Sequence, residues 1–400
     1  MASKTYAESW LPVPFGLFNN KSLCHFNALL QALASCPAIT QTVSSPEGRE
    51  VLRLTCCGRE FYNFMTAVKM STKCWLSEHP GQSLTPDPRF SSRLLAALSQ
   101  ELKDRRPTVN FGRSMESASE GLTLLLDMLE PESPPEDIKD PALFRNLFLS
   151  QKVETLWCKN CHKNRSPLPD SRSSGTISVK EDQGVITYLF DAAEEDIGPV
   201  KFAKQLDFRI EKLGDYKCEK CAKDKKEAAP LPESAVYQLT QLHWAPSIFV
   251  LCFNLYGQHK KHYYPTRFSI PASDGGELHY RIVATVNHGG TLSTGHYWCR
   301  AKRWTPGSGT NMIHRFDDNN SPVVTSIHPD KSVYMVFYHR CEADDGADSR
   351  SQSPNDPPPQ SEPKAEKPIT PGDQGGGDAP PPTAAPPSPE AGQPTQAGEA

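Results

Sequence analysis

The cysteine at position 24 stands at the start of a helical pattern, where a reactive thiol would be expected. It begins the segment "CHFNALLQALASC", in which four apolar residues recur at the spacing of one helix face: Phe26, Leu29, Leu30 and Leu33. The N-terminus of a helix stabilises negative charge, and the thiolate is the nucleophilic form of cysteine. A single cysteine in such a helix is most often a packing residue. The nucleophile hypothesis therefore depends on partners elsewhere in the chain.

The second half of the chain contains the groups that a cysteine nucleophile needs. A histidine must take the thiol proton, a further group must orient that histidine, and a donor must stabilise the oxyanion. The glycine-flanked histidines of "NHGGTLSTGHYW" are His288 and His296, and "HRFDDNN" contains Asp317 and Asp318. Alone, each would be interpreted as a structural histidine in a strand or a carboxylate in a turn. Their occurrence together with Cys24 indicates a catalytic set.

Two CxxC pairs have the residue type and spacing of a zinc site. The segments "LWCKNCHK" and "DYKCEKCAK" contain Cys158, Cys161, Cys218 and Cys221, with 56 residues between the pairs. Two such pairs can close a tetrahedral site of four thiolates, which would support folding rather than catalysis because no coordination position stays open. A c-type haem attachment at "CKNCH", a thioredoxin-like redox pair and four unrelated reduced cysteines remain alternatives.

The elements that must position these residues divide the chain into a helical half and a strand-rich half. "FYNFMTAVKM", "SSRLLAALSQELK" and "SASEGLTLLLDMLE" have helical periodicity, and the last begins with Ser117 and Glu120 in a capping-box pattern. "SIFVLCFNLY", "HYRIVATVNH", "GHYWCRAKRW" and "SVYMVFYHR" are typical of strands. Helices followed by strands predict an α+β protein with a mostly antiparallel sheet.

Composition separates a folded part from an acidic tail. Residues 343–400 contain no aromatic residue, 14 of the 37 prolines, and ten acidic against three basic residues, which predicts a disordered tail. This tail carries −7 and the whole chain −4, so residues 1–342 carry +3. A nearly neutral folded part gives no support for nucleic-acid binding.

The beginning of the sequence, "MASKTYAESWLPVPFGL", lacks the basic region and apolar run of a secretory signal. No apolar stretch approaches the ~20 residues of a membrane helix. We therefore expect no membrane partner and an intracellular location, cytoplasmic or nuclear, in which the cysteines stay reduced. The PxxP segments of the tail suggest SH3-like partners, although a solvated extension is the simpler interpretation.

Several ordered blocks resemble the ubiquitin-specific proteases, the papain-like cysteine deubiquitinases. The family's Cys box, G-L-x-N-x-G-N-T-C-Y-x-N-S-x-L-Q-x-L, is similar to "GLFNNKSLCHFNALLQAL", residues 16–33. Its His box, Y-x-L…H-x-G…G-H-Y, is similar to "YRIVATVNHGGTLSTGHY", and its closing strand to "YMVFYHR". Its Y-x-C-x-x-C knuckle is similar to "YKCEKC". The resemblance spans about residues 14–340, in order.

The resemblance implies a role for each matching residue. Cys24 would be the nucleophile, His296 the general base, and Asp317 the group that orients it, with Asp318 assisting; the choice between the two aspartates stays open. Asn19, five positions before Cys24, would stabilise the oxyanion. The implied substrate-binding residues are Glu120, His288, Gly295 and Tyr297, the first from a helix that pairs with arginines of the ubiquitin tail and the others near the channel for its glycines.

The same resemblance implies a fold and an activity. We expect a thumb–palm–fingers architecture: an N-terminal extension (1–13), a helical thumb (14–152), β-rich zinc-bearing fingers (153–245), a β-rich palm (246–342) and the tail (343–400). The expected activity is hydrolysis after the C-terminal glycine of ubiquitin, with structural Zn²⁺ and no other cofactor. A ubiquitin-binding adaptor without strong catalysis, and a protease for an interferon-induced ubiquitin-like modifier, remain alternatives. They are suggested by departures from the Cys box at Lys21, Ser22, Leu23 and His25.

Overall fold

The computed structural model describes residues 14–19, 23–78, 89–109, 117–158, 187–190, 198–214, 236–253, 263–272, 276–291, 295–305 and 310–342. All of them belong to the first of two units, Met1–Ala347 and Asp348–Ala400. The predicted N-terminal extension and acidic tail lie outside the described residues, and the predicted boundaries at 152 and 245 stay predictions. None of the described helices combines the length and the apolar composition of a transmembrane span.

Helices dominate the first half of the chain, as the periodicity predicted. They are α1 (Cys24–Ala34), α2 (Pro37–Ser44), α3 (Pro46–Arg53), α4 (Cys56–Glu78), α5 (Phe90–Arg105), α6 (Ala118–Leu129) and α7 (Leu143–Asn146), with α8 (Gly198–Asp207) further along. Proline at the first position of α2 and α3 presets their backbone. The Ser117 hydroxyl caps α6 by accepting a hydrogen bond from the Glu120 amide, which is half of the predicted capping box.

Strands dominate the second half, and nearly all of them pair antiparallel. They are β1 (Gln151–Cys158), β2 (Thr187–Phe190), β3 (Phe208–Lys212), β4 (Val236–Trp244), β5 (Ile248–Phe253), β6 (Arg267–Pro271), β7 (Glu277–Gly290), β8 (Gly295–Thr305), β9 (Thr310–Phe316), β10 (Val323–Thr325) and β11 (Val333–Cys341). The larger sheet has the order β10-β9-β8-β7-β11-β5-β2, with β6 on β7, and the smaller one the order β1-β4-β3. Only the β2–β5 pair is parallel among the described strands. The predicted α+β class is confirmed.

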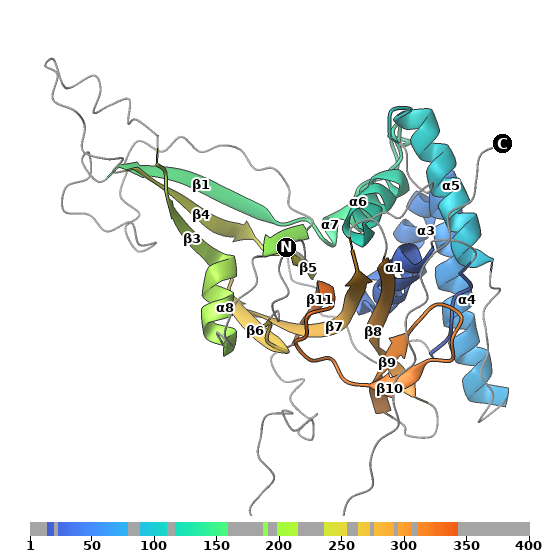
Figure 1. The fold of residues 1–400 in the computed structure, drawn as a ribbon. Coiled ribbons are helices and arrows are strands. Elements are labelled where there is room, and N and C mark those ends of the chain that lie inside the picture. Colours follow the sequence, from blue (N-terminus) through green and yellow to red (C-terminus); the bar gives the residue numbers. More distant parts are fainter. Residues whose placement is uncertain are drawn as a thin grey trace, which may run out of the picture. The chain divides into compact units, whose positions relative to one another are not determined.

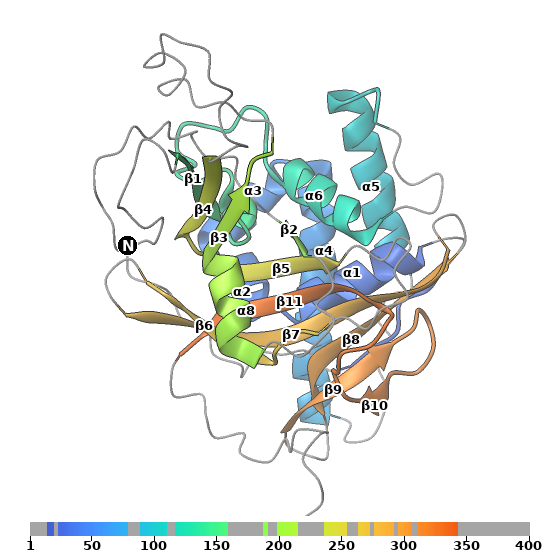
Figure 2. The same ribbon diagram turned by 60° about the vertical axis from the view of Figure 1, so that its left-hand side comes forward.

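The larger sheet separates two hydrophobic clusters. One joins its inner face to α1, α4, α5 and α6, and the other packs α8 against the opposite face, where it contacts residues of β6. Figure 2 shows α8 crossing in front of the sheet, with α1 and α4 behind it. The three-stranded sheet of β1, β4 and β3 extends away from the helices of the first half of the chain, with α8 beside β3 (Figure 1). α1 is buried on all sides because it lies between the larger sheet and the other helices of the first half of the chain.

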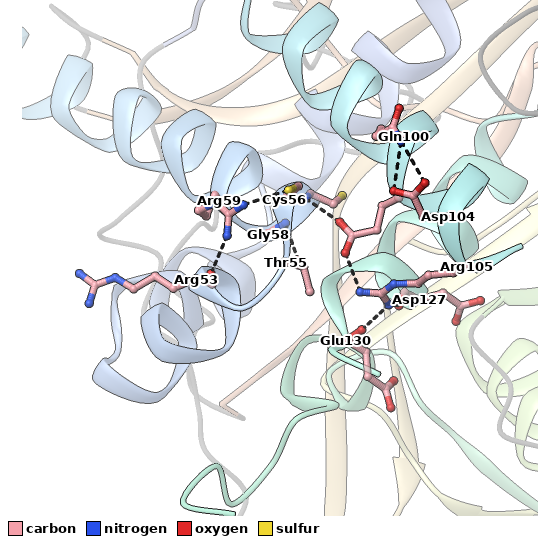
Figure 3. Close-up of polar contacts among 12 residues, drawn as sticks. Arg53, Thr55, Cys56, Gly58, Arg59, Gln100, Asp104, Arg105, Asp127 and Glu130 are labelled. Carbon is pink, nitrogen blue, oxygen red and sulfur yellow. Dashed lines mark hydrogen bonds and ion pairs between the residues drawn. The ribbon is translucent and has the colours of Figure 1, made fainter. Parts of the chain in front are cut away.

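Charged side chains fix the ends of the helices that surround α1. Glu101 of α5 accepts a hydrogen bond from the Cys57 amide in the first turn of α4, and it pairs with Arg105 at 2.6 Å. The Arg105 guanidinium also donates to the backbone carbonyl of Glu130, just after α6, at 2.7 Å (Figure 3). Carbonyls at a helix C-terminus have no partner within the helix, so Arg105 satisfies one of them. These contacts hold α4, α5 and α6 together.

A buried arginine connects α1 to the strand that carries His296. Arg303 of β8 has no exposed surface. Its guanidinium donates to the side-chain oxygen of Gln31 at 2.9 Å, to the Gln31 carbonyl at 2.8 Å, and to the Ser35 hydroxyl. Burial of a cation is tolerated only when its hydrogen bonds are made. This connection fixes the first helix against residues almost 270 positions later in the chain.

Candidate active site

Cys24 is the first residue of α1, and only 4% of its surface is exposed. Burial raises the pKa of its thiol, and the nearby Asp318 carboxylate acts in the same direction. Hydrogen bonds from the backbone amides of Tyr297, His25 and Cys24 lower the pKa and partly offset the burial. The sequence suggested that the helix N-terminus stabilises the thiolate. In the structure, desolvation raises the pKa of the Cys24 thiol more than the backbone amides lower it. A neighbouring positive charge would favour ionisation of this sulfur.

His296 is the second residue of β8, next to the Tyr297 amide that points at the Cys24 sulfur. Its Nε2 atom lies 2.6 Å from Oδ1 of Asp317, the residue that follows β9. Because Nε2 is occupied by the carboxylate, Nδ1 is the ring nitrogen left for a reacting group. A carboxylate in this position holds the imidazole in one orientation and stabilises its protonated form.

Asp318 has a different set of partners from Asp317. Its two carboxylate oxygens each accept a hydrogen bond of 2.8 Å, one from the Asn19 side-chain amide and one from the Asn27 side-chain amide. Its backbone carbonyl accepts from the Leu17 amide at 2.8 Å. The backbone at Asp318 has a φ of +50°, a conformation that aspartate tolerates better than most residues. Asp318 thus ties the segment before Cys24, through Leu17 and Asn19, and the first turn of α1, through Asn27, to the end of the β9 strand.

The side chain of Asn19 braces the residue before the nucleophile. Its Oδ1 atom accepts a hydrogen bond of 2.9 Å from the amide of Leu23, the N-cap of α1. One hydrogen of its Nδ2 group is donated to Asp318. Gly16 lies where the loop passes the turn after β9, because a Cβ atom there would be 3.0 Å from the Asp318 carbonyl and 3.1 Å from the Asn320 carbonyl. Lys21 and Ser22, two of the departures from the Cys box, lie outside the described residues.

The predicted substrate-binding residues fall into two groups. His288 and Tyr297 face each other across β7 and β8, with ring centroids 4.4 Å apart. Gly295 leaves room for His288, since a Cβ atom would come within 2.1 Å of its Nε2. Burial and the nearby His296 lower the pKa of His288, which favours a neutral ring beside the site. These three residues lie around His296.

Glu120 belongs to the second group and is separate from the catalytic set. It lies exposed in the first turn of α6, and among the described residues no hydrogen bond or ion pair joins it to Cys24, His296 or either aspartate. Ser117, the N-cap residue of the same helix, has different contacts. Its hydroxyl lies 2.7 Å from the Tyr334 hydroxyl, which also contacts Ser119. Position 117 therefore interacts with the protein interior.

Two residues of the site were not predicted from the sequence. Asn27 donates to Asp318, and to the Phe18 carbonyl at 3.3 Å; the asparagine three positions after the cysteine in the Cys box was the available signal. Arg315 donates to Oδ2 of Asp317 at 2.8 Å. Its position two residues before Asp317, on the same strand face, was a weak signal.

The predicted metal ligands are only partly within the described residues. Cys158 is buried at the end of β1, whereas Cys161, Cys218 and Cys221 lie outside the described part of the chain. Potential ligand atoms of His296, Asp317 and Asp318 lie within 4.8 Å of one another. The carboxylates of both aspartates are engaged with side chains of the site, so we assign these three residues to the hydrogen-bond network rather than to a metal ion.

The amino-acid sequence is similar to proteins of one known family. Residues 15–338 match the family model described as "Ubiquitin carboxyl-terminal hydrolase". The mouse protein "Ubiquitin carboxyl-terminal hydrolase 17-like protein E" is 22% identical over 338 residues, which are 81% of this chain and 54% of the relative. The mouse 17-like protein B is 23% identical over 338 residues, 81% of this chain and 63% of the relative. The chain therefore spans a little over half the length of the curated relatives it matches.

Solved structures share the fold at low sequence identity. The SAGA DUB module that contains Ubp8, Sgf11, Sus1 and Sgf73, bound to monoubiquitin, includes a chain that matches with a TM-score of 0.56 and 15% identity. The match covers 86% of this chain and 72% of that one. The same module bound to ubiquitin aldehyde gives a TM-score of 0.56, 15% identity and coverages of 85% and 72%. At this identity, the match establishes the fold.

Proposed function

Because the chain belongs to the ubiquitin carboxyl-terminal hydrolase family, we propose that it is a cysteine-type deubiquitinase. It hydrolyses the bond that follows the C-terminal glycine of ubiquitin, including the isopeptide bond to a lysine. One observation carries the proposal. The Tyr297 amide is directed at the Cys24 sulfur, and the adjacent His296 is held by Asp317 at 2.6 Å. A buried thiol, an oriented imidazole and a carboxylate are the groups of a thiol-protease triad.

In the proposed reaction, the Cys24 thiolate attacks the carbonyl carbon of the terminal glycine. His296 takes the thiol proton and gives it to the departing amine, and a thioester to ubiquitin forms. Water then attacks the thioester with His296 as general base, which releases ubiquitin and restores the thiol. Asp317 keeps Nε2 occupied, so that Nδ1 faces the reacting atoms throughout. Burial of the thiol makes the imidazolium the group that stabilises the thiolate.

The oxyanion requires donors beside Cys24. The backbone amides at the start of α1 have no helical partner, and Asn19 has one Nδ2 hydrogen beyond the one given to Asp318. We assign this hydrogen and the Cys24 amide to the oxyanion. Removal of one such donor costs on the order of 10²–10³ in turnover in a comparable site.

Turnover of ubiquitin with a fluorogenic C-terminal amide tests the proposal. Cys24→Ala should lower kcat by at least about a thousandfold, because the covalent route is lost. Cys56→Ala is the matched control, since Cys56 is an exposed thiol at the start of another helix, and it should keep wild-type turnover. An inactive wild type that binds ubiquitin would favour the adaptor hypothesis. Faster turnover of the interferon-induced modifier than of ubiquitin would assign that substrate instead.

We also propose that one structural zinc ion is held by Cys158, Cys161, Cys218 and Cys221. The support from the described residues is the register of the smaller sheet. β1 and β3 both run antiparallel to β4, and their last residues, Cys158 and Lys212, lie opposite Val236 and Tyr237 of that strand. In sequence, the first CxxC pair begins at the last residue of β1, and the second begins six residues after the last residue of β3. Four thiolates suit Zn²⁺ and a reducing compartment, which fits the proposed cytoplasmic or nuclear location.

A further inference from the structure

Five side chains share the outer face of β8 and β9 beside the proposed nucleophile. Arg300 pairs with Arg315 and Cys299 with Phe316 in the antiparallel register. Because side chains alternate between faces along a strand, His296, Trp298 and Arg300 of β8 lie on the same face as Arg315 of β9 and Asp317 just beyond it. The opposite face carries Cys299 and Phe316, which are buried in the core.

Arg315 contacts two of the groups around His296. Its Nη2 atom lies 2.8 Å from Oδ2 of Asp317, while Oδ1 of the same carboxylate lies 2.6 Å from His296 Nε2. Its guanidinium carbon lies 4.9 Å from the centre of the Trp298 ring. The Trp298 ring in turn stacks on the His296 imidazole at 6.3 Å with an angle of 24°. The carboxylate, the guanidinium, the indole and the imidazole thus form a closed circuit of contacts.

The circuit restricts the carboxylate in a way that one hydrogen bond does not. A carboxylate held only by His296 can rotate about its Cβ–Cγ bond, whereas a second bond from a planar guanidinium fixes both oxygens. Stacking on Trp298 keeps the guanidinium in place, because a cation is attracted to the face of an indole. Arg315 is 45% exposed, so water screens part of its charge. Its main expected effect is on geometry, with a smaller electrostatic effect on the proton of His296.

We propose that Arg315 is a positioning residue of this active site, which fixes the Asp317 carboxylate for its bond to His296 and sets the pH range of the reaction. The inference rests on the proposed deubiquitinase function. Among the described residues, the other ionisable groups around the imidazole are Asp317, His288 of β7, Asp318 and the Cys24 thiol beside the Tyr297 amide, and Arg300 shares its strand face. Arg315 is the permanent cation in contact with Asp317.

The pH profile of kcat/KM on a ubiquitin fluorogenic substrate tests this role. The active form pairs a thiolate with an imidazolium, and removal of a nearby cation makes protons harder to lose from both groups. Arg315→Gln should therefore move both limbs of the profile to higher pH, by roughly 0.3–1 unit. It should also lower kcat by about threefold to tenfold with little change in KM, since Arg315 contacts no substrate in this proposal.

Two variants separate positioning from folding. Arg315→Lys keeps the positive charge but lacks the planar guanidinium. Compared with Arg315→Gln, it should return both limbs of the pH profile to their wild-type positions but recover only part of the lost kcat. Arg53→Gln removes an exposed arginine of α3. This variant should match the wild type in kcat and in the pH profile of kcat/KM. A kcat loss in Arg315→Gln without a shift of the limbs, or a profile that superposes on the wild type, would overturn the inference. An inactive wild type would instead count against the proposed function.

Discussion

At the scale of single residues, the two adjacent aspartates divide the work of the site. Asp317 is bonded to His296 and Arg315, and Asp318 to Asn19 and Asn27. Asp318 has a left-handed backbone conformation, and its carboxylate contacts the asparagines on either side of Cys24 in sequence. The motif alone left the choice between the aspartates open, because two neighbouring carboxylates are equivalent in a sequence. The hydrogen bonds of the folded chain distinguish them, because Asp317 lies 2.6 Å from His296 and Asp318 bonds to the two asparagines.

Replacing Asp318 should disturb the segment before Cys24 and the first turn of α1, while the His296 imidazole stays in place. In Asp318→Asn, one side-chain oxygen becomes an NH₂ group that faces the NH₂ group of Asn19 or Asn27, and a donor then meets a donor. We expect kcat/KM to fall by about tenfold to a hundredfold, because small displacements of reacting groups are costly. Steady-state kinetics on the fluorogenic substrate measures it. Asp137→Asn, at an exposed aspartate, should have no effect, and wild-type kinetics in Asp318→Asn would refute the assigned role.

At the scale of elements, the periodicity predicted the long helices and the core strands but not their partners. "SIFVLCFNLY" predicts a strand where β5 lies, and the capping-box serine predicts the start of α6. Seven of the described strands, β1, β2, β3, β4, β6, β9 and β10, were not located by periodicity. For β2, β3 and β10 the reason is length, since a strand of three to five residues carries too few positions to define a period. Asn27 and Asp318 are 291 residues apart in sequence, a contact that no local pattern encodes.

The β11 strand contains a buried histidine that should make stability depend on pH. His339 has no exposed surface, and burial lowers its pKa to about 3, with the charges of Arg281 and Lys302 acting in the same direction. The unfolded chain takes up a proton near the ordinary value of about 6.5, and the folded chain does not. Between about pH 6.5 and 3 the unfolded state binds more protons, so the free energy of unfolding falls as pH falls.

Substitution of His339 should remove this acid sensitivity. Between pH 7.5 and 5, we expect the wild type to lose about 2 kcal/mol more unfolding free energy than His339→Leu, because the variant has no proton to bind at this position. Urea unfolding at the two pH values measures the difference. His328→Gln, at a half-exposed histidine, should behave as the wild type does. Equal losses in the wild type and His339→Leu would show that His339 does not act in this way.

At the scale of the whole molecule, the site is built where the two halves of the chain meet. Cys24 begins the helical half, and His296 and Asp317 belong to the sheet. Arg303 joins α1 to β8, and Leu17 bonds to the carbonyl of Asp318. The α+β class and the family follow from blocks spread over most of the chain, and both are confirmed. The contact of Arg303 with α1 was not predicted from the sequence. Arginine is mostly exposed in proteins, so an arginine in a sequence is expected at the surface.

The proposed zinc ion should contribute to the stability of the entire domain. Cys218→Ser removes one of four thiolate ligands, so the variant should lose about one equivalent of zinc and unfold at a lower temperature, since metal binding is coupled to folding. Metal analysis of the purified protein and thermal unfolding measure the two effects. Cys56→Ser, at an exposed cysteine, is the matched control. Full zinc content in Cys218→Ser would contradict the proposal. A wild type that contains no zinc and unfolds at the same temperature as Cys218→Ser would contradict it too.

In the proposed mechanism, the Cys24 sulfur is the nucleophile and His296 activates it. Reaction with ubiquitin that carries a C-terminal electrophile, followed by mass spectrometry of the peptides, identifies the attacking sulfur. We expect one adduct, on the peptide that contains Cys24. The adduct should be absent in Cys24→Ala, strongly slowed in His296→Ala and unchanged in Cys56→Ala. An adduct on a different cysteine, or equal capture by the wild type and Cys24→Ala, would contradict it.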